Sequence, residues 1–314
     1  MAIPKTYLPK KISLKLIQAL LQISLPRRKL MIYNFFHIIT NYSFMGRAVV
    51  AAVLVGIVAA VIGTFVILRG LSLMGDAIAH AVIPGVAISH VLGISHFIGA
   101  SVFGVLASFA IGFISEKSKL KKDAIIGIVF SSFFALGLVL ISRIRTVTEL
   151  HSVLFGNVLT VSDLDIKAIS IVGIILFVFI ALFYKELLLS SFDETLARVY
   201  GLKTKVMHYC FLFMLTLVVV TSLQVVGAIL IVAMIIAPAA TSYLLTNRLP
   251  IMLALSALIG SVCAIIGMFL SISFNLPAGA SIVLTLAFVF TAALLFAPKK
   301  GVIHQLKNNS NIKN

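Results

Sequence analysis

Long apolar segments separated by short polar loops make up most of this chain. Each is close to the 17–25 residues, roughly, that a helix needs to cross the hydrocarbon core of a bilayer. The pattern predicts an all-α, polytopic bundle of transmembrane helices with about nine spans, and the shorter segments leave eight to ten spans open. The nine segments are residues 46–68, 70–93, 96–115, 123–142, 166–184, 208–224, 226–246, 251–273 and 278–297.

Composition supports a membrane protein and excludes a soluble one. Hydrophobic residues form 61% of the 314 residues and charged residues only 11%, against about 25% charged in soluble domains. The net charge of +16 does not indicate nucleic-acid binding, because the Lys and Arg residues gather in short loops between apolar segments. Cys210 and Cys263 lie inside apolar segments without paired spacing, so we interpret both as core residues and expect no disulfide or thiolate metal site.

The basic loops predict the orientation in the cell membrane. The densest short basic loop, KSKLKK at 117–122, is expected on the cytoplasmic side. Alternation then places the 185–207 loop and the C-terminal tail inside, and the 143–165 loop outside. We divide the chain into a basic N-terminal extension (1–30), a permease core (31–298) and a basic cytoplasmic tail (299–314). The extension either crosses the membrane, lies on its surface or precedes a translation start at Met31; the sequence leaves these open.

Two ionisable residues stand inside the second segment, GLSLMGDAIAHAVIPGVAISHVLG at 70–93. A charged side chain at membrane depth costs roughly 2.5–3.5 kcal/mol on insertion scales and is functional by default. Asp76 and His80 are four residues apart and therefore share one helix face. Pro84 follows one turn later, where it is expected to bend the helix. The pair predicts a transit site for a divalent cation; a packing ion pair within the helix is the alternative reading.

Oxygen and nitrogen ligands together suit a first-row divalent cation without choosing among Mn, Fe and Zn. The cation would be cargo, and no resident cofactor is expected. A second helix-bending proline, Pro238, lies among small residues in the 226–246 segment. His90 falls near the expected outer mouth, where it is either an entry ligand or, as we prefer, an interfacial histidine with its own hydrogen-bond partners. His96 is expected to face a loop, and the resemblance described below assigns a role to neither residue.

The cytoplasmic loop between the fifth and sixth segments predicts a short amphipathic surface helix over about 191–202. Ser191 or Asp193 can cap its start and Gly201 can end it. No P-loop of the form G-x-x-x-x-G-K-[ST] occurs in the chain. The chain is therefore expected to be a transport subunit and not an enzyme, and any ATPase that drives it must be a separate chain.

Four stretches together resemble the membrane permeases of zinc, manganese and iron importers of the ATP-binding-cassette class. The resemblance extends in order over about residues 31–297, and the first stretch is the most specific. The stretches are LRGLSLMGDAIAHAVIPGVA, LFGNVLTVSDLD, SSFDETLARVYGL and VGAILIVAMIIAPAATSYLL.

The resemblance implies a fold, partners and roles for named residues. The fold is that of a type II importer, in a homodimer embedded in membrane lipid. Two copies of a separate ATPase would dock on the cytoplasmic side, and an extracellular metal-binding lipoprotein or periplasmic protein would dock outside. Asp76 and His80 would lie on the metal path. The coupling helix that contacts the ATPase would carry Phe192, Asp193, Ala197, Gly201 and Leu202.

Two other kinds of transporter are alternatives. A proton-driven or uncoupled metal carrier is expected to have more intramembrane acids and internal repeat symmetry, whereas Asp76 is the one carboxylate well inside a predicted span. A permease for a metal chelate, such as a siderophore or cobalamin, has no need of a ligand pair within the membrane.

Overall fold

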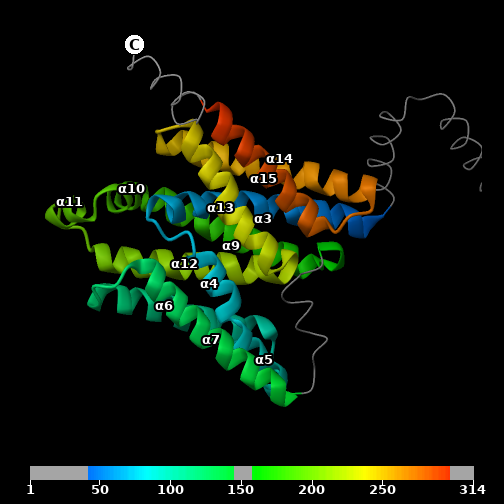
Figure 1. Cartoon of the computed structure of the whole chain (residues 1–314), viewed down its shortest axis with the longest axis horizontal. Helices are drawn as coiled ribbons and strands as arrows, with labels where there is room; N and C mark the ends of the chain where they lie inside the picture. Colours follow the sequence, from blue (N-terminus) through cyan, green and yellow to red (C-terminus); the bar gives the residue numbers. More distant parts are fainter. Residues whose placement is uncertain (1–41, 145–157, 298–314) are drawn as a thin grey trace, which may run out of the picture.

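The fold is a bundle of α-helices (Figure 1). The computed structural model describes residues 42–144 and 158–297. Within those ranges nine helical segments are long and apolar enough to cross a membrane, which confirms the predicted all-α, nine-span architecture. The extension 1–30, the tail 299–314 and residues 145–157 of the loop expected outside lie beyond the described residues; the described part of that loop includes the short 3-10 turn η1 (Val158–Thr160).

The spanning helices follow the predicted segments with ends shifted by a few residues. The second span is formed by two helices, α4 and α5, and the others are single helices. The bounds are α3 (Ser43–Leu68), α4 (Met74–Ala81), α5 (Ile83–Leu92), α6 (His96–Lys117), α7 (Lys122–Ile144), α9 (Asp163–Leu182), α12 (Thr204–Val226), α13 (Ala228–Leu245), α14 (Leu249–Phe274) and α15 (Ala278–Phe296).

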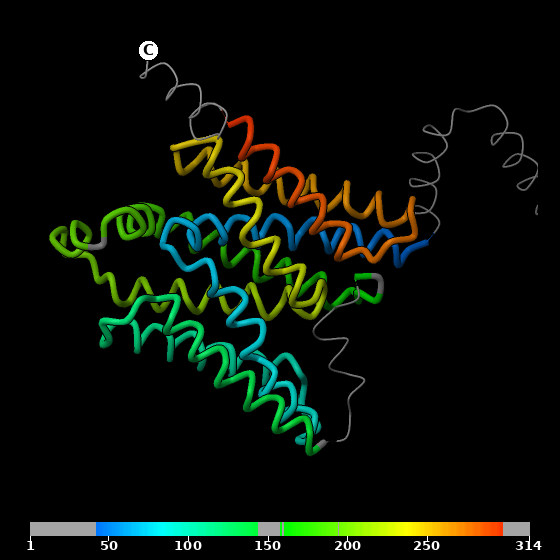
Figure 2. Tube along the Cα trace, in the orientation of Figure 1, coloured from blue at the N-terminus to red at the C-terminus, as the bar shows by residue number. Residues whose placement is uncertain are grey.

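Helix α3 is the core of the bundle, and it packs mainly against α13 and α14 and also against α9 and α12. Glycines allow these helices to approach closely. A Cβ added to Gly56 would lie 2.8 Å from the carbonyl oxygen of Gly260 in α14, and one added to Gly63 would overlap the carbonyl oxygen of Ile235 in α13. In Figure 2 the α13–α15 group (yellow to red) and the α4–α7 group (cyan to green) lie on opposite sides of α3 and α12.

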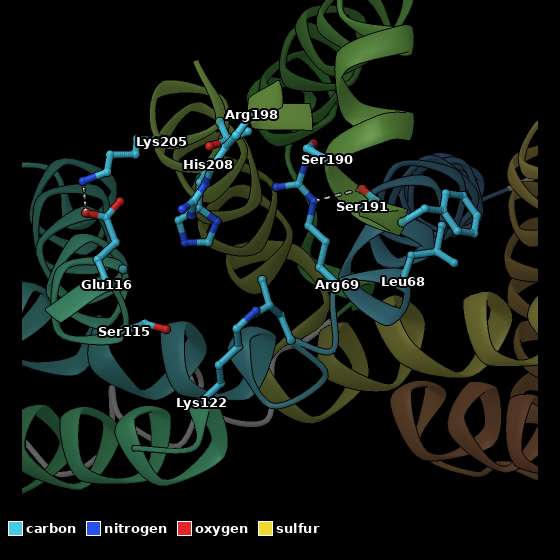
Figure 3. A pocket seen from close by; sticks show the side chains of 14 residues that line it. Leu68, Arg69, Ser115, Glu116, Lys122, Ser190, Ser191, Arg198, Lys205 and His208 are labelled. Carbon is cyan, nitrogen blue, oxygen red and sulfur yellow. Dashed lines mark hydrogen bonds and ion pairs between the residues drawn. The ribbon is translucent and has the colours of Figure 1, made fainter. Parts of the chain in front are cut away.

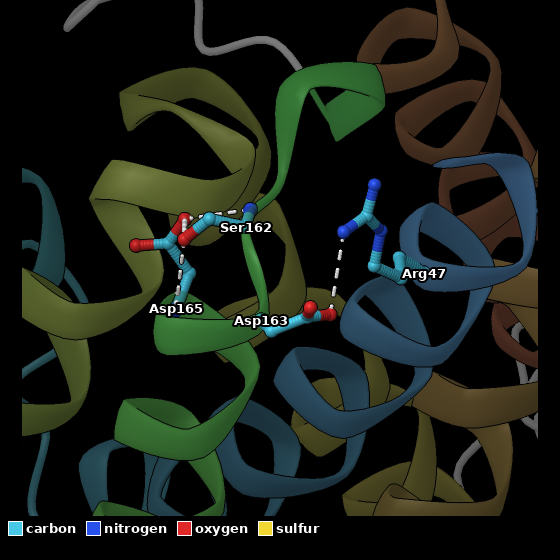
Figure 4. Close-up of polar contacts among 4 residues, drawn as sticks. All are labelled: Arg47, Ser162, Asp163 and Asp165. Carbon is cyan, nitrogen blue, oxygen red and sulfur yellow. Dashed lines mark hydrogen bonds and ion pairs between the residues drawn. The ribbon is translucent and has the colours of Figure 1, made fainter. Parts of the chain in front are cut away.

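The outer end of α3 is tied to the start of α9. Arg47 Nη1 lies 3.4 Å from Asp163 Oδ1, and both side chains are substantially exposed. The start of α9 is fixed by a capping box, in which Asp165 N donates to Ser162 Oγ at 3.2 Å and Ser162 N donates to Asp165 Oδ2 at 2.9 Å (Figure 4). The exposed ion pair contributes about 0–1 kcal/mol, so it orients the two helix ends more than it stabilises them.

The C-terminal end of α3 is tied to α10 (Tyr184–Phe192). Arg69, the residue after α3, donates from Nε to Ser191 Oγ at 3.1 Å and from Nη2 to Ser190 Oγ at 2.9 Å. Its guanidinium also lies 4.4 Å from the centre of the Phe211 ring in α12. The Arg69 side chain therefore links the end of α3 to both α10 and α12.

The predicted surface helix at 191–202 is wrong in its extent. The structure has two helices there, α10 (Tyr184–Phe192) and α11 (Glu194–Val199), separated by Asp193 in an extended conformation. Of the two possible caps, Asp193 is the one used, because its Oδ1 accepts from Leu196 N at 2.9 Å. The Ser191 hydroxyl instead donates to Leu187 O within α10 at 2.6 Å. A residue that caps one helix leaves the helical conformation and so ends the helix before it.

Candidate functional site

Asp76 and His80 lie on the short helix α4, deep in the bundle where α4 packs against α6, α7, α12 and α13. Asp76 is in the first turn, where the partial positive charge of the helix N-terminus favours a carboxylate. His80 Nε2 lies 3.4 Å from Asp76 Oδ1. The structure therefore brings the two residues together on one face, as their spacing predicts.

Both side chains keep solvent access in the single chain. The exposed fraction is 45% for Asp76 and 25% for His80. Contact between lipid hydrocarbon chains and an exposed, charged carboxylate would cost about 3 kcal/mol of free energy. The face that carries Asp76 must therefore meet either water or another protein surface in the membrane.

The His80 ring is held from α7 by two phenylalanines. Phe130 and Phe134 each meet it edge to face, with ring centroids 5.4 and 5.5 Å from that of His80. The Nδ1 atom of His80 is buried and has no hydrogen-bond partner within the described residues. This pair was not predicted from the sequence, although Phe130 and Phe134 are four residues apart and therefore share one face of α7.

The interruption after α4 fits the predicted role of Pro84. Helix α4 ends at Ala81, Val82 forms a turn, and Pro84 stands in the first turn of α5, where its missing N–H is tolerated. Pro238 lies inside α13, which continues through it, so its predicted bending role stays a prediction.

A single copy of the described chain offers few ligands for a metal ion. Within residues 42–144 and 158–297 no group of three or more His, Cys, Asp or Glu side chains could hold one. Asp76 and His80 could supply two ligands at most, and a first-row cation with four or more ligands would need water or a second chain to complete its shell.

The five residues expected on the coupling helix separate into exposed and structural positions. Phe192 is 62% exposed at the end of α10, whereas Ala197 is completely buried. Asp193 caps α11. Gly201 adopts a left-handed conformation with φ 76° that ends it, and Leu202 N closes the turn onto Ala197 O at 3.1 Å.

Other exposed apolar residues on α11 and directly after it were not predicted from the sequence. Val199 is 79% exposed, Tyr200 72% and Leu196 42%. Exposed apolar side chains on a cytoplasmic helix are typical of a protein interface. The motif alone could not identify them, because solvent exposure depends on how α11 lies against α12.

A polar cavity of about 510 Å³ opens beside α10 and α11. It is lined by the ends of α3, α6, α7 and α12, and four cationic side chains surround it, with one acidic side chain, Glu116, among its lining residues (Figure 3). Glu116 Oε2 lies 3.3 Å from Lys205 Nζ. The surplus of positive charge makes this end of the bundle suited to an acidic partner surface. The four cationic residues are Arg69, Lys122, Arg198 and Lys205.

Comparisons with known proteins agree with this architecture. The ABC 3 transport family matches residues 41–297. The chain is 53% identical over 267 residues to the manganese transport system membrane protein MntC of Listeria monocytogenes, covering 85% of this chain and 95% of that protein. It is 37% identical over 267 residues to a probable iron transport system membrane protein of Haemophilus influenzae, covering 85% and 95%. Among solved structures, PsaBC from Streptococcus pneumoniae in complex with Fab matches with a TM-score of 0.79 and 46% identity, over 90% of this chain and all of that chain.

Proposed function

The chain belongs to the ABC 3 transport family as a multi-pass membrane permease of the metal-importing ATP-binding-cassette class, and we propose that its cargo is Mn²⁺, bound in transit by Asp76 and His80. Its relatives are transport-system membrane proteins and not enzymes. Membership of this family leaves the proton-driven or uncoupled carrier without support.

One observation carries the proposal: a carboxylate that is 45% exposed stands beside a histidine on a short, interrupted helix within a membrane bundle. Had the pair served packing alone, it would be expected to be enclosed and fully hydrogen-bonded. The exposed carboxylate of Asp76, with His80 Nε2 beside it at 3.4 Å, leaves capacity for a ligand.

A second copy of the chain completes this site. Two copies that meet across the Asp76 face would contribute two carboxylates and two imidazoles, a mixed oxygen and nitrogen set that suits a first-row divalent cation. The same contact would cover the exposed carboxylate and remove the cost of facing it toward lipid. Loosely held ligands suit transport, because a closed cage would trap the ion.

Manganese is favoured over iron by the relatives. The relative named for manganese is 53% identical, and the one named for iron is 37% identical. Carboxylate oxygens are also ligands that Mn²⁺ accepts readily.

The test is metal uptake by cells that lack other importers for these ions. Asp76→Asn keeps the side-chain shape and removes the charge, so it should abolish Mn²⁺ uptake while the permease still binds its ATPase. Asp163→Asn is the matched control, because this carboxylate lies in the exposed outer ion pair with Arg47; it should transport normally. Near wild-type uptake by Asp76→Asn would show that the pair has a packing role only. Preferential uptake of Fe²⁺ or Zn²⁺ over Mn²⁺ would correct the cargo.

We also propose that the α10–α11 segment binds the separate ATPase, with Phe192, Val199 and Tyr200 as apolar contacts and the basic cavity facing acidic groups of the partner. An extracellular metal-binding lipoprotein or periplasmic protein would deliver the cation from the other side.

Co-purification tests the ATPase contact. Phe192→Asp should release the ATPase, since it puts a charge into an apolar contact. Leu120→Asp is the control, because Leu120 is an equally exposed apolar residue (56%) in the loop between α6 and α7, and it should keep the ATPase bound. Equal retention by both variants, or equal release, would contradict a specific role for Phe192.

A further inference from the structure

Two histidines that the proposed function does not use meet at the outer end of the interrupted span. His90 is in the last turn of α5 and His96 is the first residue of α6. Their rings are nearly parallel, with centroids 5.9 Å apart and planes inclined by 12°. His96 is exposed and His90 is half-buried. Helix α5 lies at the end of the molecule away from α10 and α11, on the side expected to face outward (Figure 1).

The backbone around the two rings is closely fixed. Helix α5 ends at Gly93, in the left-handed conformation with φ 67°, and Ile94 N donates to Ser89 O at 3.1 Å to close the turn. Below the turn, α5 and α6 touch backbone to backbone: a Cβ on Gly85 would overlap the carbonyl oxygen of Gly99. This contact sets the separation of the two helices, so the imidazoles are held near each other by the fold and not by their own attraction alone.

The spacing of the rings suits a shared metal ion. An imidazole nitrogen binds a first-row cation at about 2.0–2.1 Å, so two rings that share one ion have centroids no more than about 6.5 Å apart. The nitrogen lone pair lies in the plane of its ring, so one of the two stacked rings must turn before both nitrogens point at one ion. The exposed side chain of His96 is the one placed to turn. No third His, Cys, Asp or Glu completes a cluster with them within the described ranges. A cation held there would keep water in its remaining positions and could leave again, as a transport pathway requires.

From this geometry we propose that His90 and His96 form an outer binding site for a divalent first-row cation, which receives the ion before it reaches Asp76 and His80. The existence of the site depends on the two imidazoles alone; its role as a step in import rests on the proposed function. Because both ligands are nitrogens, the site should bind Zn²⁺ more tightly than Mn²⁺. The inner pair includes a carboxylate and is less biased toward Zn²⁺, so the two sites should differ in metal preference.

Metal binding is the direct test, with the permease–ATPase complex in lipid nanodiscs and without the extracellular binding protein or ATP. Free Mn²⁺ is followed by electron paramagnetic resonance during titration, nitrogen ligands are detected by electron spin-echo modulation, and Zn²⁺ is added as a competitor. His90→Gln, His96→Gln and the double variant are compared with His80→Gln, which removes an inner ligand. His208→Gln is the matched control, because His208 lies in the cytoplasmic cavity.

Either outer substitution should remove one Zn²⁺ site, and the double variant should lose no more than either single one, because the two rings share one ion. His80→Gln and His208→Gln should keep that site. In uptake assays the outer variants should raise the Mn²⁺ concentration needed for half-maximal rate severalfold and leave the maximal rate unchanged.

Wild-type Zn²⁺ and Mn²⁺ binding by the double variant would overturn the proposal and leave the proposed function intact. His96 is exposed at the surface, so His96→Gln remains a valid test if the half-buried His90 position does not tolerate substitution. Conversely, normal uptake by Asp76→Asn would overturn the proposed function, while the binding measurement on the outer pair would still decide whether that site exists.

Discussion

Helix α3 and the α4–α5 span follow each other in the chain and lie in the same bundle. They differ in how far their polar side chains are hydrogen-bonded within the protein. Helix α3 is continuous over 26 residues. The α4–α5 span has 19 residues and is interrupted at Val82. Both are mostly buried, so burial alone does not separate a structural span from a functional one.

The difference lies in how completely each polar group is satisfied. In α3, Thr64 is completely buried; its Oγ1 lies 2.9 Å from Ser256 Oγ in α14 and donates to Ala60 O at 3.1 Å. In α4, Asp76 is 45% exposed, and His80 Nδ1 has no hydrogen-bond partner in the part of the chain that the structure describes. A polar group that finds its partners inside the fold contributes to packing, whereas one left with unused capacity at membrane depth has a ligand or a partner chain to meet.

The largest effect is expected from the α4 pair taken as a unit. Asp76→Ala and His80→Ala should each abolish Mn²⁺ uptake, and the double variant should be no worse than either single one, because both remove the same site. Uptake and ATPase co-purification would be measured in parallel for all three. Partial, additive losses would instead indicate two independent packing roles, and α4 would then resemble α3.

An intermediate effect is expected from the helix contacts of α3. Gly63→Val adds atoms where a Cβ already overlaps the carbonyl oxygen of Ile235, so α3 and α13 must move apart. Overpacking of this kind costs about 1–3 kcal/mol. The thermal midpoint of the detergent-purified permease should fall clearly. Gly127→Ala in α7 is the control, because nothing lies within 4 Å of an added Cβ there; an equal fall in both variants would show that the α3–α13 contact is not limiting.

The smallest effect is expected from the hydroxyl pair. Thr64→Val keeps the shape and removes a hydrogen bond between α3 and α14, and such bonds between membrane helices are worth about 0.6 kcal/mol on average. Without Thr64 the single proton of the Ser256 hydroxyl can go to Leu253 O, 2.9 Å away, which limits the loss. Thermal unfolding should change little and uptake should be unaffected. Loss of uptake by Thr64→Val would contradict the contrast between α3 and α4, since α3 would then have a role in transport.

The amino-acid sequence by itself determined the spans, the depth of Asp76 and the loop that carries α11. Apolar segments of spanning length leave the backbone no alternative to helices in hydrocarbon, and this is a local property that can be read along the chain. The spacing of Asp76 and His80 put both on one helix face for the same reason. Capping by Asp193 was also predictable, with Ser191 as the alternative, because a cap bonds to residues only a few positions away.

Only the tertiary structure decided how these elements meet. That Phe130 and Phe134 hold the His80 ring, and that Ala197 is buried while Val199 is exposed, both follow from packing between elements distant in the chain. The pairing of His90 with His96 depends on the close contact of α5 with α6 at Gly85 and Gly99. The apolar pattern within one helix does not encode such contacts, because in a membrane helices associate through shape and small residues and not through hydrophobicity.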